Sequence, residues 1–424
     1  MSNISYPIII VGSGKATLLH LNAYMRIWDV QEPPRIFIVA GDFVEPEIKN
    51  IAKKNPSYVQ FKDMQQVIEL RKSETVIDIC TPTATHGKII DKMADAGFTR
   101  FIVEKPLVTT AGDLERISSR NIHVAIMHNY LFSKATERAL GLIQANEFVP
   151  KSMASCFCKD RVRESVMKRG FNGDEPPHVF TIEIPHQLYL ATEFLGLAKV
   201  EAAYAEDMRI DNSVFPSHGA GVIYLEHPAS VLDELQNPFS VHYSCLSSDK
   251  PIKCVVISGS SGQTLTINYP VSKSALTSTV EIQDGMGNHC IEVFENDDMM
   301  KRALEHYYTS LTSDAPSFAN SCHGSKDGAW MVIEALSKSN RLPPGVLSKT
   351  REHVTVQALA SGGIPSMYIW YDCHGPIIYR RAIQMKTYTI DQFDELADKY
   401  GISHRPYRAE LPESGKMPLQ NVGD

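Results

Sequence analysis

The first residues with a clear chemical use lie near the start of the chain, where the apolar run Ile8–Val11 meets two glycines. Gly12 allows a tight turn, and Gly14 lets the backbone approach a pyrophosphate whose charge meets the N-terminus of the following helix. Thr17 stands where a third glycine is usual in such turns. We predict a dinucleotide-binding turn made of Gly12, Ser13, Gly14, Lys15 and Ala16.

An acidic residue follows the second apolar run of the chain. Asp42, with Phe43 after it, comes shortly beyond Arg35–Ala40. A carboxylate at this point accepts hydrogen bonds from the ribose hydroxyls and repels a 2′-phosphate, and no arginine directly follows it. We therefore expect NAD as the cofactor, held in part by Asp42 and Phe43. The alternative is a turn aspartate that caps the next segment.

Three later segments carry side chains suited to proton transfer and to stabilising charge on oxygen. They are Thr81-Pro82-Thr83-Ala84-Thr85-His86, Glu104-Lys105-Pro106, and the stretch from His186 to Gly196, with a weaker echo at His128-Asn129-Tyr130. In this order, at predicted strand ends, the set resembles the Gfo/Idh/MocA oxidoreductase family, named for glucose–fructose oxidoreductase, inositol dehydrogenase and a rhizopine-catabolism protein. The resemblance runs from about residue 7 to 340.

The resemblance implies a role for each segment. Thr81, Pro82, His86 and Asn129 would line the cofactor groove, and Glu104 and Lys105 would lie beside the nicotinamide ribose. Lys105 would also reach the reacting oxygen, and His186 would accept or donate the proton. The expected reaction is hydride transfer to or from a hydroxyl or keto carbon of a sugar, sugar derivative or cyclitol.

Elementary chemistry agrees with these two roles. A histidine, whose ordinary pKa is about 6.5, exchanges protons near neutral pH. A lysine ammonium stabilises a developing alkoxide.

The surroundings of His186 depart from the family pattern. Ile182 occupies the place of an acid four residues before this histidine, and Glu183 lies three residues before it. Tyr189 occupies the place of an acid three residues after it. Three alternatives stay open: Glu183 orients His186, Tyr189 acts as its hydroxyl partner, or both residues are structural.

The elements that must position these residues change character along the chain. Short apolar runs alternate with helical stretches up to about residue 130, which predicts a doubly wound parallel sheet of the Rossmann type. From about Ser152 longer strand-like runs follow one another, which predicts a C-terminal α+β domain with a largely antiparallel sheet. The predicted domains are residues 1–135 for NAD binding, 136–349 for substrate binding and oligomerisation, and 350–424 as an appendage with a hairpin, a helix and a loose tail.

Composition excludes several classes of protein. The formal net charge of -7 disfavours nucleic-acid binding, and no apolar run approaches the ~20 residues that span a bilayer. The eight cysteines form no CxxC pair, so we expect reduced, mostly buried thiols and no metal site. The first residues lack the features of a signal peptide, so a cytoplasmic protein is expected. We also expect a homodimer or homotetramer that acts on a polyhydroxylated small molecule.

A second hypothesis belongs to a different class. Some relatives with this fold bind a dinucleotide and act as regulators without catalysis. Lys105 and His186 separate the two hypotheses, because a pure sensor does not need a proton carrier beside a lysine. Their presence favours an enzyme.

Overall fold

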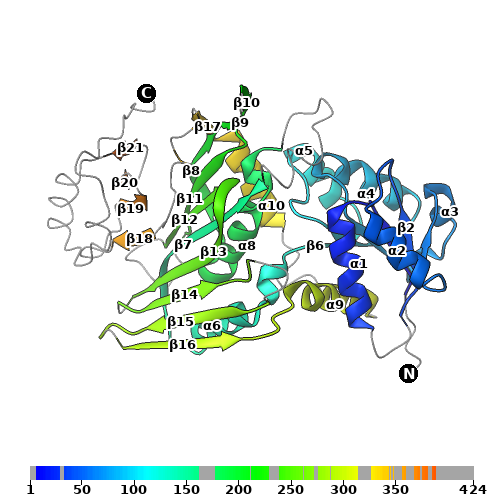
Figure 1. Cartoon of the computed structure of the whole chain (residues 1–424), viewed down its shortest axis with the longest axis horizontal. Helices are drawn as coiled ribbons and strands as arrows, with labels where there is room; N and C mark the ends of the chain where they lie inside the picture. Colours follow the sequence, from blue (N-terminus) through cyan, green and yellow to red (C-terminus); the bar gives the residue numbers. More distant parts are fainter. Residues whose placement is uncertain are drawn as a thin grey trace. The chain divides into compact units, whose positions relative to one another are not determined.

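The computed structural model describes residues 6–28, 33–161, 177–210, 212–228, 238–260, 262–271, 276–286, 288–313, 326–342, 344 and 347, together with the backbone of four later strands. The chain divides into two compact units, and each is described by itself (Figure 1). Unit 1 consists of Met1–Glu137 and Asp297–Ile333, and unit 2 of Arg138–Asn296 and Glu334–Asp424.

Unit 1 is built on a parallel sheet of six strands in the order β3-β2-β1-β4-β5-β6. Every residue of β1, β2 and β4 is buried, which shows that both faces of the sheet are covered and explains the continuous apolar runs in the sequence. The strands are β1 (Ile8–Val11), β2 (Ile36–Val39), β3 (Val59–Phe61), β4 (Val76–Ile79), β5 (Arg100–Val103) and β6 (His123–Ile126).

The helices of unit 1 connect these strands. The chain runs outward from β1 to β3 and then returns to β4, so the strand order reverses between β1 and β4. Doubly wound folds bind their ligands at such a switch point, beyond the carboxyl ends of the strands. The helices are α1 (Lys15–Ile27), α2 (Pro46–Lys54), α3 (Met64–Ile68), α4 (His86–Asp95), α5 (Ala111–Ser118) and α9 (Met299–Thr312), and α6 (Lys134–Gln144) continues into unit 2.

Helix α9 lies far along the chain but packs in unit 1, beside α1. Arg26 Nε donates to Asp298 Oδ2 over 2.7 Å, and the rings of Trp28 and Tyr308 meet edge to face with centroids 5.1 Å apart. The sequence placed this segment in the second domain, whereas the structure groups residues 297–333 with the dinucleotide-binding sheet.

Unit 2 contains a sheet of nine strands in the order β16-β15-β14-β13-β7-β12-β11-β8-β17. Its pairings are antiparallel except β7 with β12 and β8 with β17. The expected fold class, a Rossmann sheet followed by an α+β domain with a largely antiparallel sheet, is confirmed. The strands are β7 (Pro150–Asp160), β8 (Lys199–Glu206), β11 (Ala220–Glu226), β12 (Phe239–Cys245), β13 (Ser247–Gly259), β14 (Thr264–Asn268), β15 (Ser278–Gln283), β16 (His289–Phe294) and β17 (Ser339–Leu342).

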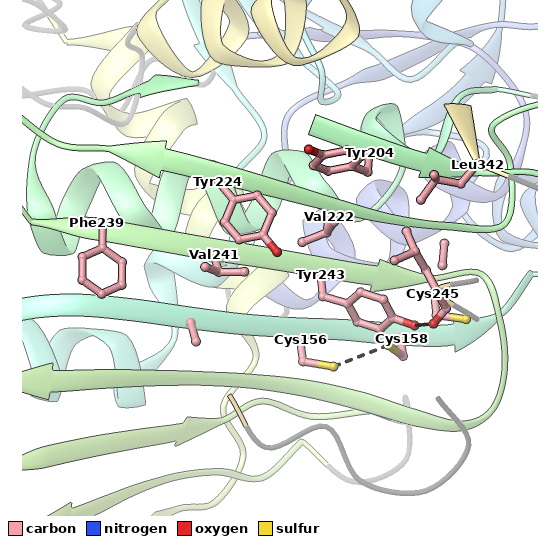
Figure 2. Packing of buried hydrophobic residues seen from close by; sticks show 13 residues of the cluster. Cys156, Cys158, Tyr204, Val222, Tyr224, Phe239, Val241, Tyr243, Cys245 and Leu342 are labelled. Atoms are coloured by element: carbon pink, nitrogen blue, oxygen red, sulfur yellow. Dashed lines mark hydrogen bonds between the residues drawn. The ribbon is translucent and has the colours of Figure 1, made fainter. Parts of the chain in front are cut away.

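The two faces of this sheet differ. Helix α8 (Ile184–Leu195) packs against β7 and β12 on one face, where Ser155 and His242 project. The opposite face presents a buried apolar cluster that includes Cys156, Tyr243 and Val222 (Figure 2). Cys156 Sγ and Cys158 Sγ lie 3.5 Å apart as free thiols. Successive residues of one strand thus face opposite sides of the sheet: Ser155 faces α8, and Cys156 faces the apolar cluster.

Two shorter features lie outside the nine-stranded sheet. β9 (Met208–Ile210) and β10 (Ser213–Phe215) form a separate two-stranded sheet, and α10 (Lys326–Ser337) leads from unit 1 into unit 2. No helix among the described residues is long and apolar enough to cross a bilayer.

The C-terminal appendage contains a four-stranded sheet in the order β18-β19-β20-β21. The hairpin expected around Asp372 and Gly375 is formed by β19 and β20. The helix expected near residues 389–401 lies outside the described residues. Strand β18 lies against β7, and Tyr243 Oη donates to the Leu347 carbonyl over 2.9 Å, so the chain beyond β17 runs onto the apolar face of the large sheet. The strands are β18 (Val356–Leu359), β19 (Met367–Asp372), β20 (Gly375–Arg380) and β21 (Gln384–Thr387).

Candidate functional site

The glycine turn joins β1 to α1 at the switch point. Gly12 has a φ of +126°, and a Cβ on it would lie 2.7 Å from the Cys80 carbonyl oxygen, so only glycine fits. Gly14 caps α1, and a Cβ there would meet nothing within 4 Å. No side chain caps this helix, and its first amide groups remain available to an anion. Lys15 is exposed and Ala16 half-buried in the first helical turn.

Ser13 ties this turn to the loop after β2. Its hydroxyl donates to the Phe43 carbonyl over 2.5 Å and accepts from the Gly41 amide over 3.2 Å, and its own carbonyl accepts from the Glu45 amide over 2.9 Å. Asp42 lies exposed within this loop. The acid predicted to bind ribose therefore stands on a loop bonded directly to the predicted phosphate turn.

The turn after β4 is joined to the turn after β5 by His86. The ring is fully buried, with Nε2 2.9 Å from the Thr81 carbonyl and Nδ1 3.1 Å from the Leu107 carbonyl. Burial lowers the pKa of His86, and its contacts with these carbonyl oxygens oppose that shift only in part. His86 therefore links the turn after β4 to the turn after β5. Its predicted cofactor contact stays a prediction. Pro82 is exposed and Thr81 half-buried on the same turn.

Glu104 and Lys105 follow β5, as predicted, and the Lys105–Pro106 peptide bond is cis. Glu104 Oε2 accepts from the Lys105 amide over 3.2 Å, and its Oε1 lies 3.0 Å from Nε2 of His20. Asn129 is half-buried after β6, in the short helix Asn129–Phe132. Its predicted contact with the cofactor stays a prediction.

A buried polar chain behind Glu104 was not foreseen from the sequence. His20 and Tyr24 come from α1, one turn apart, and Asp78 from the middle of β4. All three are completely buried. A usable signal was present, because a lone acid inside the apolar run Val76–Ile79 must find a partner in the core.

His186, the predicted proton carrier, and its two candidate partners, Glu183 and Tyr189, lie in unit 2, in the first part of α8 or just before it. Glu183 occupies the N-cap position of this helix without a side-chain cap, and Pro185 lies in the first turn. The Glu183 carboxylate accepts from Lys159 Nζ and from Arg161 Nη2, the latter over 3.1 Å. His186 is half-buried, and its amide donates to the Glu183 carbonyl over 3.2 Å. The Glu183 carboxylate, which orients His186 in one of the three alternatives, is thus engaged by two cations.

Burial affects the charge of Lys159, which pairs with Glu183. Burial lowers the pKa of Lys159 to about 8, although the adjacent Glu183 favours its ammonium form. Tyr189, the alternative partner of His186, is buried on the next turn of α8. Arg161 begins a basic stretch of the sequence, and its later members, Arg163, Lys168 and Arg169, lie outside the described residues.

A ladder of buried hydrogen bonds holds α8 on the sheet from both of its ends. Ser155 Oγ donates to Gln187 Oε1 over 2.6 Å and lies 2.7 Å from His242 Nδ1. Ser240 Oγ is 2.8 Å from both His242 Nε2 and His227 Nε2. The last rung joins His227 Nδ1 to the carbonyl of Gly196, which ends α8, over 2.8 Å.

The rings of this ladder are kept neutral. Burial lowers the pKa of His242 to about 3, with a further contribution from His227, and burial lowers the pKa of His227 to about 4. Neutral imidazoles can donate from one nitrogen and accept at the other, as a continuous ladder requires. Sequence reasoning missed this ladder, because its members come from four separate segments.

Among the described residues, one group has possible metal-ligand atoms close together. Atoms of His20, Asp78 and Cys80 lie within 4.8 Å of one another. His20 Nδ1 already contacts the Asp78 carboxylate at 2.9 Å, and burial raises the pKa of the Cys80 thiol to about 12. The Cys80 thiol is therefore neutral, and both ring nitrogens of His20 already have partners. These atoms form a hydrogen-bonded network and not a set of metal ligands.

Known proteins resemble the chain in its first part and in its fold. Residues 7–121 match the family model described as "Oxidoreductase family, NAD-binding Rossmann fold". No curated protein matches the chain in sequence.

Solved structures share the fold at low identity. A 3-ketoreductase from Actinomadura kijaniata, in complex with NADP and TDP-benzene, is 13% identical with a TM-score of 0.62, over 80% of this chain and 99% of that one. UDP-N-acetylglucosamine 3-dehydrogenase from Acidithiobacillus ferrooxidans is 13% identical with a TM-score of 0.57, over 79% and 96%. A putative NADPH-dependent oxidoreductase from Desulfitobacterium hafniense is 12% identical with a TM-score of 0.60, over 78% and 95%.

Proposed function

We propose that this chain is an NAD(H)-dependent enzyme acting on a hydroxyl or keto carbon of a sugar-type substrate. Its residues 7–121 match the model of the Gfo/Idh/MocA oxidoreductase family. The observation that carries this proposal is the glycine turn, tightly packed at Gly12 and open at Gly14, which is bonded through Ser13 to the loop that holds Asp42. The helix N-terminus suits a pyrophosphate, and Asp42 suits a ribose with a free 2′-hydroxyl.

The nicotinamide supplies the hydride chemistry when it is bound. Lys105 is proposed to donate a hydrogen bond to the substrate oxygen and to stabilise the charge that develops there. His186 is proposed to accept the hydroxyl proton during oxidation and to return it during reduction. Glu183 pairs with Lys159 and Arg161 at the start of the helix that carries His186, so the chemistry proposed here assigns it no proton transfer.

The proposed substrate class draws on two structural relatives. One is a 3-ketoreductase bound to TDP-benzene, and the other is named for UDP-N-acetylglucosamine. Nucleotide-linked sugars with a hydroxyl or keto group at carbon 3 are therefore the first substrates to test, followed by free sugars and cyclitols. The NADP bound by the first relative does not decide the cofactor here, because Asp42 would oppose a 2′-phosphate.

The test is a panel of these compounds with NAD or NADH, followed by the absorbance of the reduced nicotinamide. We expect turnover of at least one sugar-type compound by the wild type. Lys105→Met should reduce kcat by about 10²–10³, the usual cost of one lost oxyanion donor. The matched control, Lys53→Met, changes an exposed lysine on α2 and should leave kcat unchanged. Dinucleotide binding without turnover of any compound would favour a regulatory protein.

A further inference from the structure

A line of alternating charges crosses the core of unit 1 behind Lys105. Tyr24 Oη donates to Asp78 Oδ2 over 2.9 Å, and the same carboxylate oxygen lies 2.9 Å from His20 Nδ1. The other ring nitrogen, His20 Nε2, lies 3.0 Å from Glu104 Oε1. Glu104 Oε2 then accepts from the backbone amide of Lys105. The line therefore starts on α1 and ends at the proposed reactive lysine.

Burial restricts the protonation states that this line can adopt. The side chains of His20 and Asp78 have no exposed surface, and that of Glu104 is 16% exposed. A neutral imidazole can donate from one nitrogen only, so it would leave its second nitrogen facing a carboxylate without a proton. An imidazolium donates to both carboxylates, and each buried anion then has a cation beside it.

We propose that His20 is a positioning residue, a buried imidazolium that bridges Asp78 and Glu104 and thereby holds the Glu104 carboxylate in place as an anion beside Lys105. The inference rests on the proposed function, because it gives Lys105 the reacting role. His20 itself has no contact with substrate in this account. It acts through Glu104, which fixes the backbone and the charge environment of Lys105.

The charged and titratable groups around His20 agree with this assignment. Burial opposes the charged ring, but the Asp78 carboxylate raises the pKa of His20 well above its ordinary value. Burial opposes the ionised form of Glu104, but the hydrogen bond and charge of His20 lower its pKa, with Lys105 and His86 assisting. Burial and the neighbouring Asp78 raise the pKa of Tyr24, which keeps its hydroxyl a donor.

Removal of the His20 charge has a defined consequence. Asp78 and Glu104 would remain as two acids without a cation between them, and Glu104 would bind a proton. Lys105 would then lose an anionic neighbour that favours its ammonium form. The alkaline limb of the pH profile of kcat/KM should therefore move to lower pH.

The first experiment reads the ring directly in the full-length wild type, without any need for turnover. The protein is labelled with ¹⁵N-histidine, and the His20 signals are assigned by their loss in His20→Gln, or by their shift in Asp78→Asn if the first variant does not fold. Both ring nitrogens should stay protonated from pH 6 to about 8, well above the ordinary histidine pKa of about 6.5. A His20 ring that is neutral at pH 7.5 would overturn the proposal.

The second experiment compares kinetics. His20→Gln should lower kcat/KM by about 10–100-fold, the range that a misplaced reacting group produces, and should shift the alkaline limb, while dinucleotide affinity changes less. The control is His289→Gln, because His289 also pairs with an acid, Glu281 at 2.7 Å, but at the surface. This variant should change neither kcat/KM nor the alkaline limb of its pH profile. An unshifted pH profile in His20→Gln would mean a merely structural role. If the wild type turns over no compound, the proposed function fails, and the nitrogen signals still decide the state of His20.

Discussion

The hydrogen-bonded ladder under α8 makes the stability of this protein depend on pH in a predictable way. His242 and His227 have pKa values of about 3 and about 4 in the folded chain, because burial disfavours their charged forms. In the unfolded chain each should titrate near its ordinary value of about 6.5. The unfolded state therefore binds more protons than the folded state between these limits.

The sign follows from that difference. The contribution of these two neutral histidines to the free energy of unfolding is fully present above about pH 6.5. It is lost as the pH falls toward 4, because protons then favour the unfolded chain. One histidine contributes about 1.4 kcal/mol for each pH unit in this window, or about 2 kcal/mol at pH 5. Both histidines together should lower the free energy of unfolding by about 4 kcal/mol at pH 5, a large part of the 5–15 kcal/mol typical of folded domains.

Urea unfolding at pH 7, 6 and 5 measures this effect. His242→Gln should cost about 1–3 kcal/mol at pH 7, because it leaves ladder groups poorly paired. Its free energy of unfolding should then fall less steeply between pH 6 and 5, by about 1.4 kcal/mol per unit relative to the wild type. His289→Gln removes an exposed histidine and serves as the control for slope. If His242→Gln keeps the wild-type slope, the ring of His242 is already charged in the folded chain and the reasoning is wrong.

Three further changes test the site and the appendage. His186→Ala should lower kcat by about 10²–10⁴ and remove one ionisation from the pH profile; an unchanged profile would point to another proton carrier, with Tyr189 the first candidate. The wild type should prefer NAD to NADP in kcat/KM, and Asp42→Ala should reduce that preference, whereas a wild type that prefers NADP contradicts the role given to Asp42. Truncation after Lys349 removes β18, which lies against β7, and should therefore expose apolar surface of the large sheet and give insoluble protein or a changed oligomer on size exclusion. A truncated protein that is soluble, active and unchanged in oligomeric state would show that the appendage is independent.

Local signals made much of unit 1 predictable. The apolar run before Gly12 is a strand, the turn needs glycine because the Cys80 carbonyl lies against it, and Lys105 follows a strand as expected. Short continuous apolar runs that alternate with helical stretches up to β6 indicated the parallel sheet, because strands buried on both faces are apolar throughout.

Long-range pairing was the part that sequence could not supply. His20 meets Asp78 across 58 residues and Glu104 across 84, and neither separation leaves a periodic trace. The same holds for α9, because nothing in its local sequence indicates that it packs beside α1 in unit 1. In unit 2, Glu183 was singled out because it lies three residues before His186 in the sequence. In the structure its carboxylate pairs with Lys159, on β7, and with Arg161, just after β7.

The most direct test of the proposed function is a single turnover with NADH that carries deuterium on the transferred face of carbon 4, mixed with a 3-keto nucleotide sugar and the wild-type protein. We predict that the deuterium appears on the carbon of the new hydroxyl group, and that Lys105→Met slows this step by about 10²–10³ while NADH still binds. Bound NADH that never passes its deuterium to any keto sugar or keto cyclitol would contradict the assignment of this chain as a sugar-type oxidoreductase.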